Sequence, residues 1–546
     1  KLAAHFASEY TRGEYAAMYG QLDPSTRHRL TAARFARTLR RDLATATVTS
    51  ARVVGRPRLR PGGSYEVPMR VRTRLFGTLE LPYELRTTSR EGTTQVAFSN
   101  SLAFPGLRPG EHLSRNTNLP RRATLLARDG SVLAESPEQA AAGAEAAARS
   151  SPLGNVATAL LGGVGPAPSS RRAELEALGV PPTGPVGTSG LELALDSRLR
   201  GTPGGQLLAG ARLLASARPH PAPALHTSIS PALQSATVGA LGGQYGGIVA
   251  MRPSGQILAV AGIGLDGLQP PGSTFKMVTL ASVLAAHIAN PHTVFPYATF
   301  ATLDGVKLNN ANGEECGGSL ELAFAVSCNS VFTPLGVRLG APRLVASAEA
   351  FGFNHPTGIP GAPASTLPSA GEIMGELEVG STAIGQGRVL ATPLQMALVA
   401  ATIADRGDRP QPTFLLTSPP PARRRVVSPA VARTVRRLME GVVRRGTGTA
   451  AAIPGVTVAG KTGTAELKSA CTSPQAVSSE SSTAGEENCR GTESQPENTD
   501  AWFAAFAPAL HPHVVVCVLL VKDGAGGATA APVARQVLEA ALQERL

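Results

Sequence analysis

The sequence predicts a multidomain α+β protein whose C-terminal part is an antiparallel sheet flanked by helices, with a largely helical insert. Three observations lead to this fold class. The chain has 546 residues, which exceeds the size of one ordinary domain. Hydrophobic residues make up 42% of it, which is enough to fill several cores. The spacing of these residues changes between helical and strand periodicity in successive blocks.

Residues 1–103 are predicted to form a small α+β domain. Residues 3–19 and 32–43 have the apolar spacing of helices. Four alternating segments separated by Gly/Pro turns then predict strands, at 47–54, 64–71, 78–85 and 93–103. Two helices followed by a four-stranded meander can form an independent unit.

Residues 104–225 are predicted to form an extended pedestal, because apolar residues are sparse and Gly, Pro and Ser are frequent. A strand-like segment at 124–134 surrounds a turn, and an alanine-rich helix is expected at 137–149. Residues 215–225 contain three prolines and are typical of a linker.

Residues 226–546 carry the strongest pattern and are predicted to form the main domain. A β-hairpin is expected at 246–261, and two further strands at 502–506 and 514–521. Helical spacing is found at 274–289, 320–339, 393–405, 429–445 and 532–546. Strands separated by helices in this order favour the sheet and the helical insert described above.

Lysine is rare in this chain, and its position indicates the chemistry. Only six of the 51 basic residues are lysines. Arginine keeps its proton, whereas a lysine loses its proton when it is buried or placed beside another cation. Lys276 lies three residues after Ser273, which is one turn along a helix that begins near residue 274. The pair predicts a serine nucleophile with a lysine as its base.

Two further short motifs follow the serine and lysine. Ser327-Cys328-Asn329 comes 54 residues after Ser273, and Lys461-Thr462-Gly463-Thr464 comes before a strand at residue 502. Gly463 has no side chain, so a ligand could approach its backbone closely. Each motif is weak alone, because caps and turns use the same residues. In this order, the three resemble the active-site set of the penicillin-binding proteins and serine β-lactamases.

The resemblance to the penicillin-binding proteins extends over most of the chain. Segments 227–231, 385–387 and 392–397 are similar to parts of the transpeptidase domain, and 104–107 and 128–134 to the pedestal, or dimerisation, domain. The first domain resembles the nuclear-transport-factor-like domain of methicillin-resistance-type class B members. Arg122-Ala123 replaces the usual Arg-Gly of the pedestal, and a polar insertion separates Lys468 from Asp500.

The resemblance implies a peptidoglycan D,D-transpeptidase, which cross-links stem peptides through a serine acyl-enzyme and is acylated by β-lactams. It implies catalytic roles for Ser273, Lys276, Ser327, Asn329 and Lys461, as nucleophile, base, proton relay, amide holder and electrostatic support. It assigns substrate binding to Thr462, Gly463 and Thr464, and an oxyanion hole to the N–H groups of Ser273 and Thr464. No metal or cofactor is implied.

The resemblance also implies partners and a location. The partners are peptidoglycan stem peptides, β-lactam antibiotics and other cell-wall synthesis proteins, and the location is the extracytoplasmic face of the bacterial cell membrane. The longest apolar run, 514–521, is far shorter than the ~20 residues of a membrane span. Because the chain starts at Lys1 inside a helical pattern, we expect an N-terminal anchor upstream of it. Nucleic-acid binding is not indicated.

Five cysteines leave one unpaired in an oxidising compartment. Cys471 and Cys489 bracket the polar insertion, and a disulfide between them is the preferred pairing. Cys316 with Cys328 is the second choice, and Cys517 is expected to be a buried thiol. A fully reduced chain is the alternative.

Two other functions fit the same motifs. A D,D-carboxypeptidase or β-lactamase would use water in place of the acceptor amine. A non-catalytic β-lactam sensor or cell-wall scaffold would acylate its serine without processing substrate.

Overall fold

The computed structural model describes residues 1–546 except 62, 91–92, 137–148, 417–421, 468–497 and 545–546. The chain divides into two compact units. Unit 1 comprises residues 1–124, 135–150 and 163–224, and unit 2 comprises residues 125–134, 151–162 and 225–546. Most of the helix expected at 137–149 lies outside the described residues.

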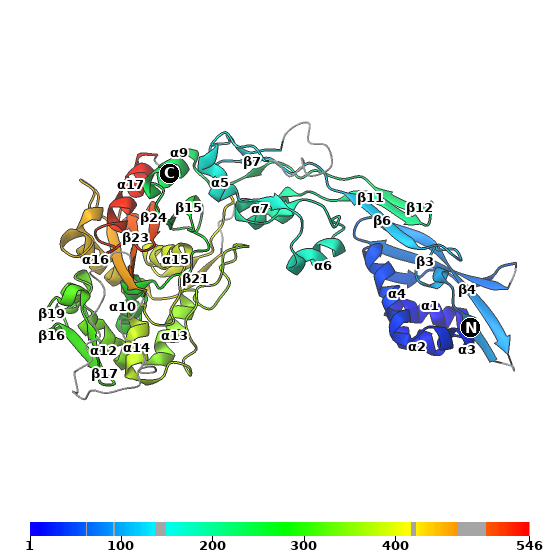
Figure 1. Ribbon diagram of the computed structural model, residues 1–546, viewed down its shortest axis with the longest axis horizontal. Coiled ribbons are helices and arrows are strands. Elements are labelled where there is room, and N and C mark those ends of the chain that lie inside the picture. Colours follow the sequence, from blue (N-terminus) through cyan, green and yellow to red (C-terminus); the bar gives the residue numbers. More distant parts are fainter. Residues whose placement is uncertain (62, 91–92, 137–148, 417–421, 468–497, 545–546) are drawn as a thin grey trace, which may run out of the picture. The chain divides into compact units, whose positions relative to one another are not determined.

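Unit 1 begins with four helices packed on an antiparallel sheet (Figure 1). The helices are α1 (Leu2–Arg12), α2 (Tyr15–Gly20), α3 (Pro24–Arg29) and α4 (Ala32–Thr45). The strands β1 (Val48–Val53), β3 (Ser64–Thr73), β4 (Thr78–Arg90) and β5 (Thr93–Ala97) pair in that order, and β2 (Arg58–Leu59) pairs with β3. The expectation of one helix over 3–19 was wrong, because Gly13 adopts φ 73° and ends α1.

The rest of unit 1 combines a small sheet with a buried group of charges. Strands β6 (Leu113–Asn118), β11 (Gly204–Ala209) and β12 (Arg212–Ala217) are antiparallel. Arg122 pairs with Glu192 at 2.7 Å and with Asp196 at 2.9 Å, and Arg149 pairs with Glu192 at 2.7 Å. These side chains are almost completely buried, so each charge depends on its partners.

Unit 1 also contains short elements around these charges. They are η1 (Asn100–Leu102), β9 (Val164–Gly165), β10 (Val186–Gly187), α6 (Ser169–Ala177), α7 (Gly190–Ala194) and α8 (Asp196–Leu199). Glu192 lies on α7 and Asp196 begins α8, so two short helices supply the carboxylates that Arg122 binds.

Unit 2 is built on a five-stranded antiparallel sheet, which confirms the predicted fold class. Its strands are β14 (Gly246–Met251), β15 (Ile257–Gly262), β22 (Ala459–Glu466), β23 (Thr499–Ala507) and β24 (Val514–Leu520). They lie in the order β15-β14-β24-β23-β22, with Lys461 opposite Ala504. The motif-bearing strand β22 is therefore at the end of the described sheet.

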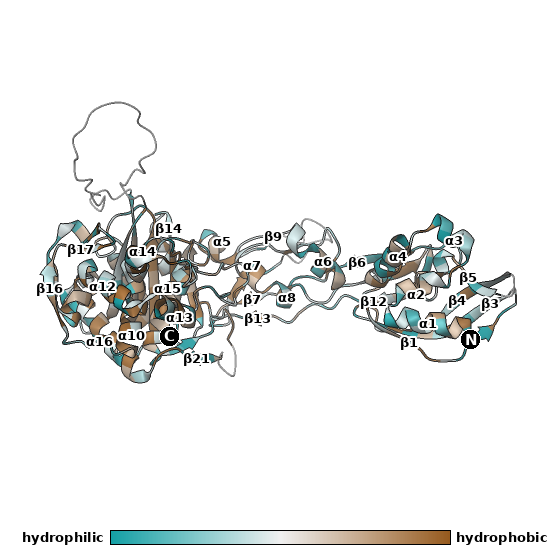
Figure 2. Ribbon diagram, turned by 90° about the horizontal axis from the view of Figure 1, so that it is seen from below, coloured by the Kyte–Doolittle hydropathy of each residue, from teal (hydrophilic) through white to brown (hydrophobic). Residues whose placement is uncertain are grey.

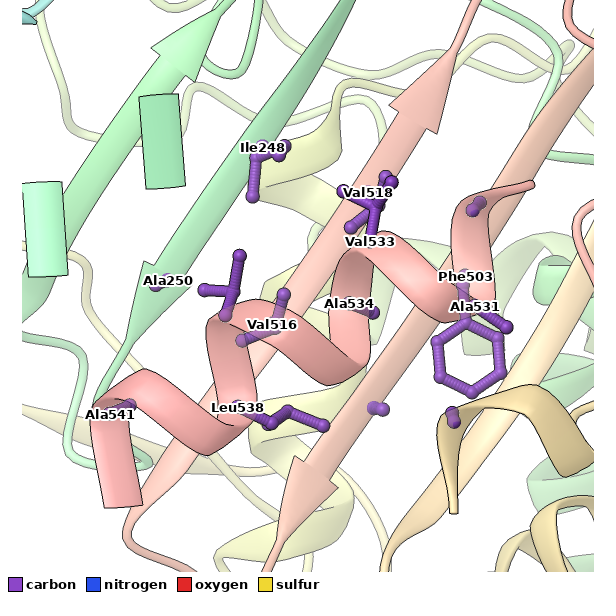
Figure 3. Packing of buried hydrophobic residues seen from close by; sticks show 14 of the residues in the cluster. Ile248, Ala250, Phe503, Val516, Val518, Ala531, Val533, Ala534, Leu538 and Ala541 are labelled. Atoms are coloured by element: carbon purple, nitrogen blue, oxygen red, sulfur yellow. The ribbon is translucent and has the colours of Figure 1, made fainter. Parts of the chain in front are cut away.

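Helices cover both faces of this sheet. The helices α9 (Pro231–Leu241) and α17 (Ala530–Gln543) pack on one face, where Val533 and Leu538 join Val516 and Val518 in one apolar core (Figure 3). Alternate residues of a strand point to opposite faces. The fully buried α15 (Pro393–Ala404) contacts β14, β23 and β24 as well. The ribbon around α15 has the brown colour of hydrophobic residues in Figure 2.

Side-chain caps fix where several unit 2 helices begin. The hydroxyls of Ser230, Thr392 and Ser428 accept the N–H of the residue three positions on, and a proline follows each of them. They begin α9, α15 and α16 (Pro429–Arg445).

The insert of unit 2 contains helices and short strands. The helices are α10 (Lys276–Ala285), α11 (Leu320–Ala325), α12 (Asn329–Leu339), α13 (Ala341–Ala350) and α14 (Gly375–Ala383). The short strands are β16 (Val294–Ala298), β17 (Phe300–Leu303), β18 (Val306–Asn309) and β19 (Cys316–Ser319).

The expectation of one helix over 320–339 was wrong. Ser327 has φ 62°, which no α-helix accommodates, so α11 ends before it and α12 begins after it. None of the described helices is both long and apolar enough to cross a bilayer.

Candidate active site

Ser273 lies in a 3₁₀ turn, η3 (Gly272–Phe275), which leads directly into α10. Gly272 opens the turn with φ 51°, and its N–H donates to the carbonyl of Gly385 at 3.0 Å. A Cβ added to Gly272 would lie 2.7 Å from the carbonyl oxygen of Thr464. The serine turn is therefore packed tightly against β22, and glycine is needed there for both conformation and space.

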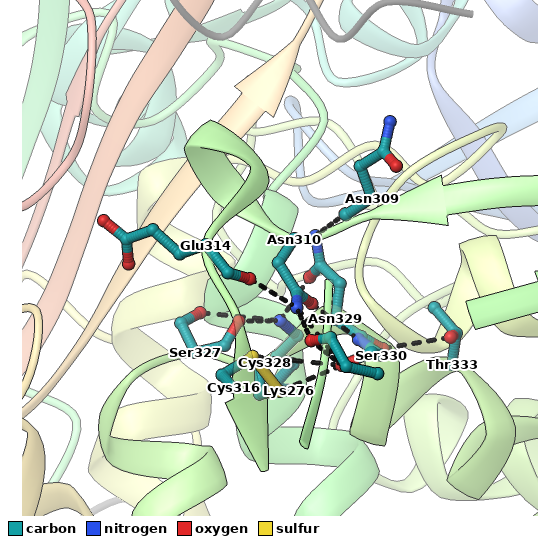
Figure 4. Close-up of a disulfide and its surroundings, with 11 residues drawn as sticks. Lys276, Asn309, Asn310, Glu314, Cys316, Ser327, Cys328, Asn329, Ser330 and Thr333 are labelled. Atoms are coloured by element: carbon teal, nitrogen blue, oxygen red, sulfur yellow. Dashed lines mark hydrogen bonds between the residues drawn. A yellow bond between two sulfur atoms is a disulfide. The ribbon is translucent and has the colours of Figure 1, made fainter. Parts of the chain in front are cut away.

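Lys276 is the first residue of α10 and is completely buried. Its amine donates to the Ser327 carbonyl oxygen at 2.7 Å and to Asn329 Oδ1 at 2.6 Å, and lies 3.5 Å from Ser327 Oγ (Figure 4). The ring of Phe332 lies 5.6 Å from the amine. The lysine of the first motif thus contacts both polar residues of the second.

Ser327 also contacts the third motif. The amine of Lys461 donates to Ser327 Oγ at 2.8 Å and to the Thr462 carbonyl at 3.1 Å. Burial lowers the pKa of Lys461 to about 7. The Ser327 hydroxyl is therefore within reach of two lysine amines, which lets a proton pass between them through one oxygen.

The remaining residues of the third motif lie on β22, as Lys461 does. Thr462 Oγ1 lies 2.5 Å from Thr447 Oγ1, and Thr464 Oγ1 accepts the N–H of Gly526 at 3.3 Å. A Cβ on Gly463 would lie 2.8 Å from the Pro271 carbonyl and 3.0 Å from a Thr274 methyl. Gly463 therefore has a packing reason as well, since it lets the serine turn and β22 come together.

The sequence patterns did not identify the residues that form hydrogen bonds with the second motif and with the residue after it. Asn310 Oδ1 accepts the N–H of Ser330 at 2.8 Å, and Asn329 Nδ2 donates to the Asn309 carbonyl at 2.9 Å. The aromatic rings of Phe324 and Phe332 lie beside the two lysine amines. No spacing rule identifies Asn309 or Asn310, because their contacts join segments about 20 residues apart.

The structure joins Cys316 and Cys328 by a disulfide. Cys471 and Cys489 lie outside the described residues. Cys517 is a buried thiol on β24, and burial raises its pKa well above the usual value. In the described part of the chain, no cluster of His, Cys, Asp and Glu could hold a metal ion.

A cavity of about 550 Å³ lies in unit 1, and none of the motif residues lines it. It is lined by exposed Arg29, Arg34 and Arg41 and by the buried Asp42, together with residues such as Phe98 and His112. Arg41 already binds Asp42 at 2.9 Å. Because it contains none of the motif residues, we assign the chemistry to the Ser273 site instead.

Two parts of the chain match known protein families. Residues 246–539 match the family described as "Penicillin binding protein transpeptidase domain", and residues 140–210 match "Penicillin-binding Protein dimerisation domain". Two relatives carry the name "Peptidoglycan D,D-transpeptidase PbpA". The one from Mycolicibacterium smegmatis is 38% identical over 299 residues, and the one from Mycobacterium tuberculosis H37Rv is 39% identical over the same length.

Each of these alignments covers 50% of this chain and 55% of the relative, so the chain spans about half the length of the curated relatives it matches. A solved D,D-transpeptidase domain from Eggerthella lenta is 30% identical, with a TM-score of 0.58 over 78% of this chain and 99% of the other. The ceftriaxone acyl-enzyme of penicillin-binding protein A from M. tuberculosis is 29% identical, with a TM-score of 0.58 over 77% of this chain and 98% of the other.

Proposed function

This chain belongs to the penicillin-binding protein transpeptidase family, and from that premise we propose that it is a class B, serine-type peptidoglycan D,D-transpeptidase. The observation that carries the proposal is the Ser327 hydroxyl, which lies 3.5 Å from the Lys276 amine and 2.8 Å from the Lys461 amine. Three motifs far apart in the sequence thereby form one hydrogen-bonded chain, as a proton relay requires.

In the proposed reaction, Ser273 Oγ attacks the penultimate carbonyl of a peptide that ends in D-Ala-D-Ala. A neutral lysine amine has two N–H groups and one lone pair. The Lys276 amine donates to the Ser327 carbonyl and to Asn329 Oδ1, which fix its position, and in its neutral form it is proposed to accept the Ser273 proton. The proton then moves through Ser327 to the amine of the departing D-Ala, and the serine ester remains.

Deacylation completes the transfer. An amine from a neighbouring stem peptide attacks the ester and gives up a proton along the same relay, which restores Ser273. The low pKa of Lys461, caused by burial, suits a group that shares a proton at neutral pH. A β-lactam enters the same first step, and its ester then occupies Ser273.

Packing of the serine turn against β22 supports the substrate-binding roles. The close approach of Gly272 to Thr464 favours an oxyanion hole made by the N–H groups of Ser273 and Thr464. The hydroxyls of Thr462 and Thr464 are proposed to bind the terminal carboxylate, and Gly463 keeps the strand close to the turn.

The domain organisation belongs to the same proposal. Residues 1–103 form a nuclear-transport-factor-like domain as in methicillin-resistance-type members, 104–225 a dimerisation or pedestal domain, and 226–546 the transpeptidase domain. Helices α1 and α4 packed on an antiparallel sheet support the first assignment, and the match over 140–210 supports the second. We further propose attachment to the outer face of the bacterial cell membrane through an upstream anchor, and partners in cell-wall synthesis.

Labelling with a fluorescent penicillin tests the proposal. The parent chain is expected to retain the label after denaturation, and Ser273→Ala is expected to lose it. Ser235→Ala, at an exposed position of α9, serves as the control and should label like the parent. Label that persists in Ser273→Ala contradicts the nucleophile, and acylation without transfer to an added amine acceptor favours a sensor over a transpeptidase.

A further inference from the structure

Residues 521–529, the loop between β24 and α17, pack directly on the third motif. The N–H of Gly526 donates to Thr464 Oγ1 at 3.3 Å. A Cβ added to Gly526 would overlap the carbonyl oxygens of Gly463 and Trp502, so a glycine lets the loop backbone lie this close to β22 and β23. A shift of this loop therefore changes the surroundings of Thr464.

The loop leaves β24 through a strained residue, Lys522. Its φ of 58° is unfavourable for a residue with a side chain, and such conformations persist where the surroundings impose them. The Lys522 N–H donates to Asp500 Oδ1 at 3.0 Å, and the N–H of Asp523 donates to the Thr499 carbonyl at 3.0 Å. The Asp500 carboxylate thus holds the N–H of the residue at which the chain bends.

Asp500 lies where it reaches both the loop and the strand of the third motif. It is completely buried on β23 and pairs with Ala465, the residue after Thr464. Its second oxygen, Oδ2, has no hydrogen-bond partner among the described residues. Burial raises the pKa of Asp500 to about 6, although the N–H and the ammonium group of Lys522 act against this shift. A buried carboxylate with so few hydrogen bonds costs stability, and such costs are found at functional sites.

The bond from Gly526 also determines how the Thr464 hydroxyl can act. A hydroxyl group has one hydrogen to donate and two lone pairs that accept. Because Thr464 Oγ1 accepts the Gly526 N–H, one lone pair is occupied and the hydroxyl hydrogen is directed elsewhere. That hydrogen is then available to a negatively charged oxygen, as the proposed binding of a carboxylate requires.

We propose that Asp500 is a positioning residue for Thr464, on which it acts through the 521–529 loop. The inference rests on the proposed function, which assigns the ligand carboxylate to Thr464. With Asp500 in place, the loop brings the Gly526 N–H to Thr464, and the hydroxyl is oriented to donate to the carboxylate. Without Asp500, Lys522 relaxes from its left-handed conformation, Gly526 moves away from Thr464, and the hydroxyl loses its fixed orientation.

The effect is expected on binding more than on the chemical step. Rapid-mixing kinetics with a fluorescent penicillin that has a free carboxylate separate the two. In Asp500→Ala, the dissociation constant of the non-covalent complex should rise at least tenfold. The acylation rate constant within that complex should change less than threefold, because the hydrogen bonds that join Lys276, Ser327 and Lys461 do not pass through the loop. A general loss of structure would impair both quantities.

Two further variants make the comparison specific. Asp500→Asn keeps an oxygen acceptor in a side chain of the same shape, so both quantities should stay within threefold of the parent. Glu372→Ala removes an exposed carboxylate that accepts the Ser369 N–H at 2.9 Å, and this control should behave like the parent. A tenfold loss of binding in Asp500→Asn overturns the proposal, as does unchanged binding in Asp500→Ala.

A double variant tests whether Asp500 acts through Thr464. Thr464→Val removes the hydroxyl and keeps the shape of the side chain. In the Thr464→Val background, Asp500→Ala should raise the dissociation constant less than threefold, because the group that Asp500 positions is already absent. If the two effects multiply in full, the positioning role is overturned.

Amide hydrogen exchange provides a readout that does not depend on penicillin. Peptides that cover residues 521–529 should exchange faster in Asp500→Ala than in the parent and in Asp500→Asn, while those of α15 remain unchanged. If Asp500→Ala does not fold, Asp500→Leu replaces it, since leucine lacks an acceptor, has a similar shape and removes the cost of the buried carboxylate. If the parent takes up no penicillin, the proposed function fails, and exchange alone then decides whether Asp500 holds the loop. Equal exchange in the parent and in the variant without an acceptor overturns the inference.

Discussion

The amine of Lys461 donates a 2.8 Å hydrogen bond to the hydroxyl of Ser327, which lies 134 residues earlier in the chain. This contact connects the edge strand β22 to the gap between α11 and α12. Its donor is fully buried, and burial lowers the pKa of Lys461 to about 7. A buried amine without a carboxylate partner costs stability, and such costs are found at functional sites.

The first prediction concerns stability and pH. The unfolded chain keeps its proton on Lys461 up to about pH 10.5, whereas the folded chain releases it near pH 7. Between these values the folded state binds fewer protons, so stability increases as the pH rises, and the full penalty of about 5 kcal/mol applies below pH 7. The free energy of unfolding of the parent, relative to Lys461→Met, should therefore rise from pH 7 to pH 9.5 in urea titrations.

Lys307→Met is the matched control, because Lys307 is an exposed lysine in the same unit. The difference in the free energy of unfolding between Lys307→Met and the parent should stay constant over this pH range. If the free energy of unfolding changes with pH equally in Lys461→Met and in the parent, the lowered pKa of Lys461 is contradicted.

The second prediction tests the contact between Lys276 and Asn329. Asn329→Asp keeps the shape of the side chain but places a carboxylate 2.6 Å from the Lys276 amine. The negative charge favours the protonated amine, so Lys276 loses its capacity as a base. The second-order rate constant for acylation by a fluorescent penicillin at pH 7 should fall by a factor of about 10² to 10⁴. Asn354→Asp, outside the site but in the same unit, should retain the parent rate, and a full rate in Asn329→Asp removes Asn329 from the relay.

Part of this site could be predicted from sequence because the chemistry restricts residue choice. Lysine is rare in this chain, so its positions indicate Lys276 and Lys461 as candidates. Each of them lies in a short motif with fixed spacing. The sheet and its covering helices were predictable for a similar reason, since β24 and α17 carry clear periodic patterns. The motif residues Lys276, Ser327, Asn329 and Lys461 do meet in space.

The break at Ser327 could not be predicted, because the residue that ends α11 in the left-handed conformation is a serine and not the glycine that usually marks such an end. Apolar spacing continues from α11 into α12, so the pattern favours one long helix. The left-handed conformation of Ser327 instead closes the end of α11, where the Ser327 N–H donates to the Phe324 carbonyl at 3.2 Å and the Cys328 N–H to the Ala323 carbonyl at 2.8 Å. Asn310 was missed for a different reason, since its side chain bridges Ala298, Glu314 and Ser330 without any local motif.

The third prediction uses the close packing of the serine turn on β22. Gly463→Ala would place a methyl group 2.8 Å from the Pro271 carbonyl oxygen. Cβ atoms in proteins essentially never come this close to another heavy atom. The turn must move away from the strand, and the proposed oxyanion donors then separate. The acylation rate should fall at least tenfold, because small displacements of catalytic groups are costly. Gly441→Ala in α16 meets no atom within 4 Å and should retain the parent rate; equal rates in the two variants would remove the steric argument.

The fourth prediction separates stability from catalysis through the buried charges of unit 1. Burial alone would raise the pKa of Asp196, but the Gly187 N–H and the Arg122 guanidinium outweigh it and hold the pKa below its usual value. Asp196→Asn leaves Arg122 and Arg200 without this negative partner, and loss of one partner of a buried pair costs about 3–5 kcal/mol. Since the folded pKa is depressed, the contribution of Asp196 is present at neutral pH and is lost as the pH falls through that pKa.

Thermal unfolding of the full chain at pH 7 should therefore show an earlier transition in Asp196→Asn, and the difference from the parent should shrink towards pH 3. Penicillin acylation at 25 °C should be retained, because Ser273, Lys276 and Lys461 all lie in unit 2. Glu539→Gln, which removes a partly exposed pair with Arg535 on α17, should change stability by less than about 0.5 kcal/mol. An Asp196→Asn protein that melts like the parent at pH 7 would show that the buried charges of unit 1 do not stabilise it.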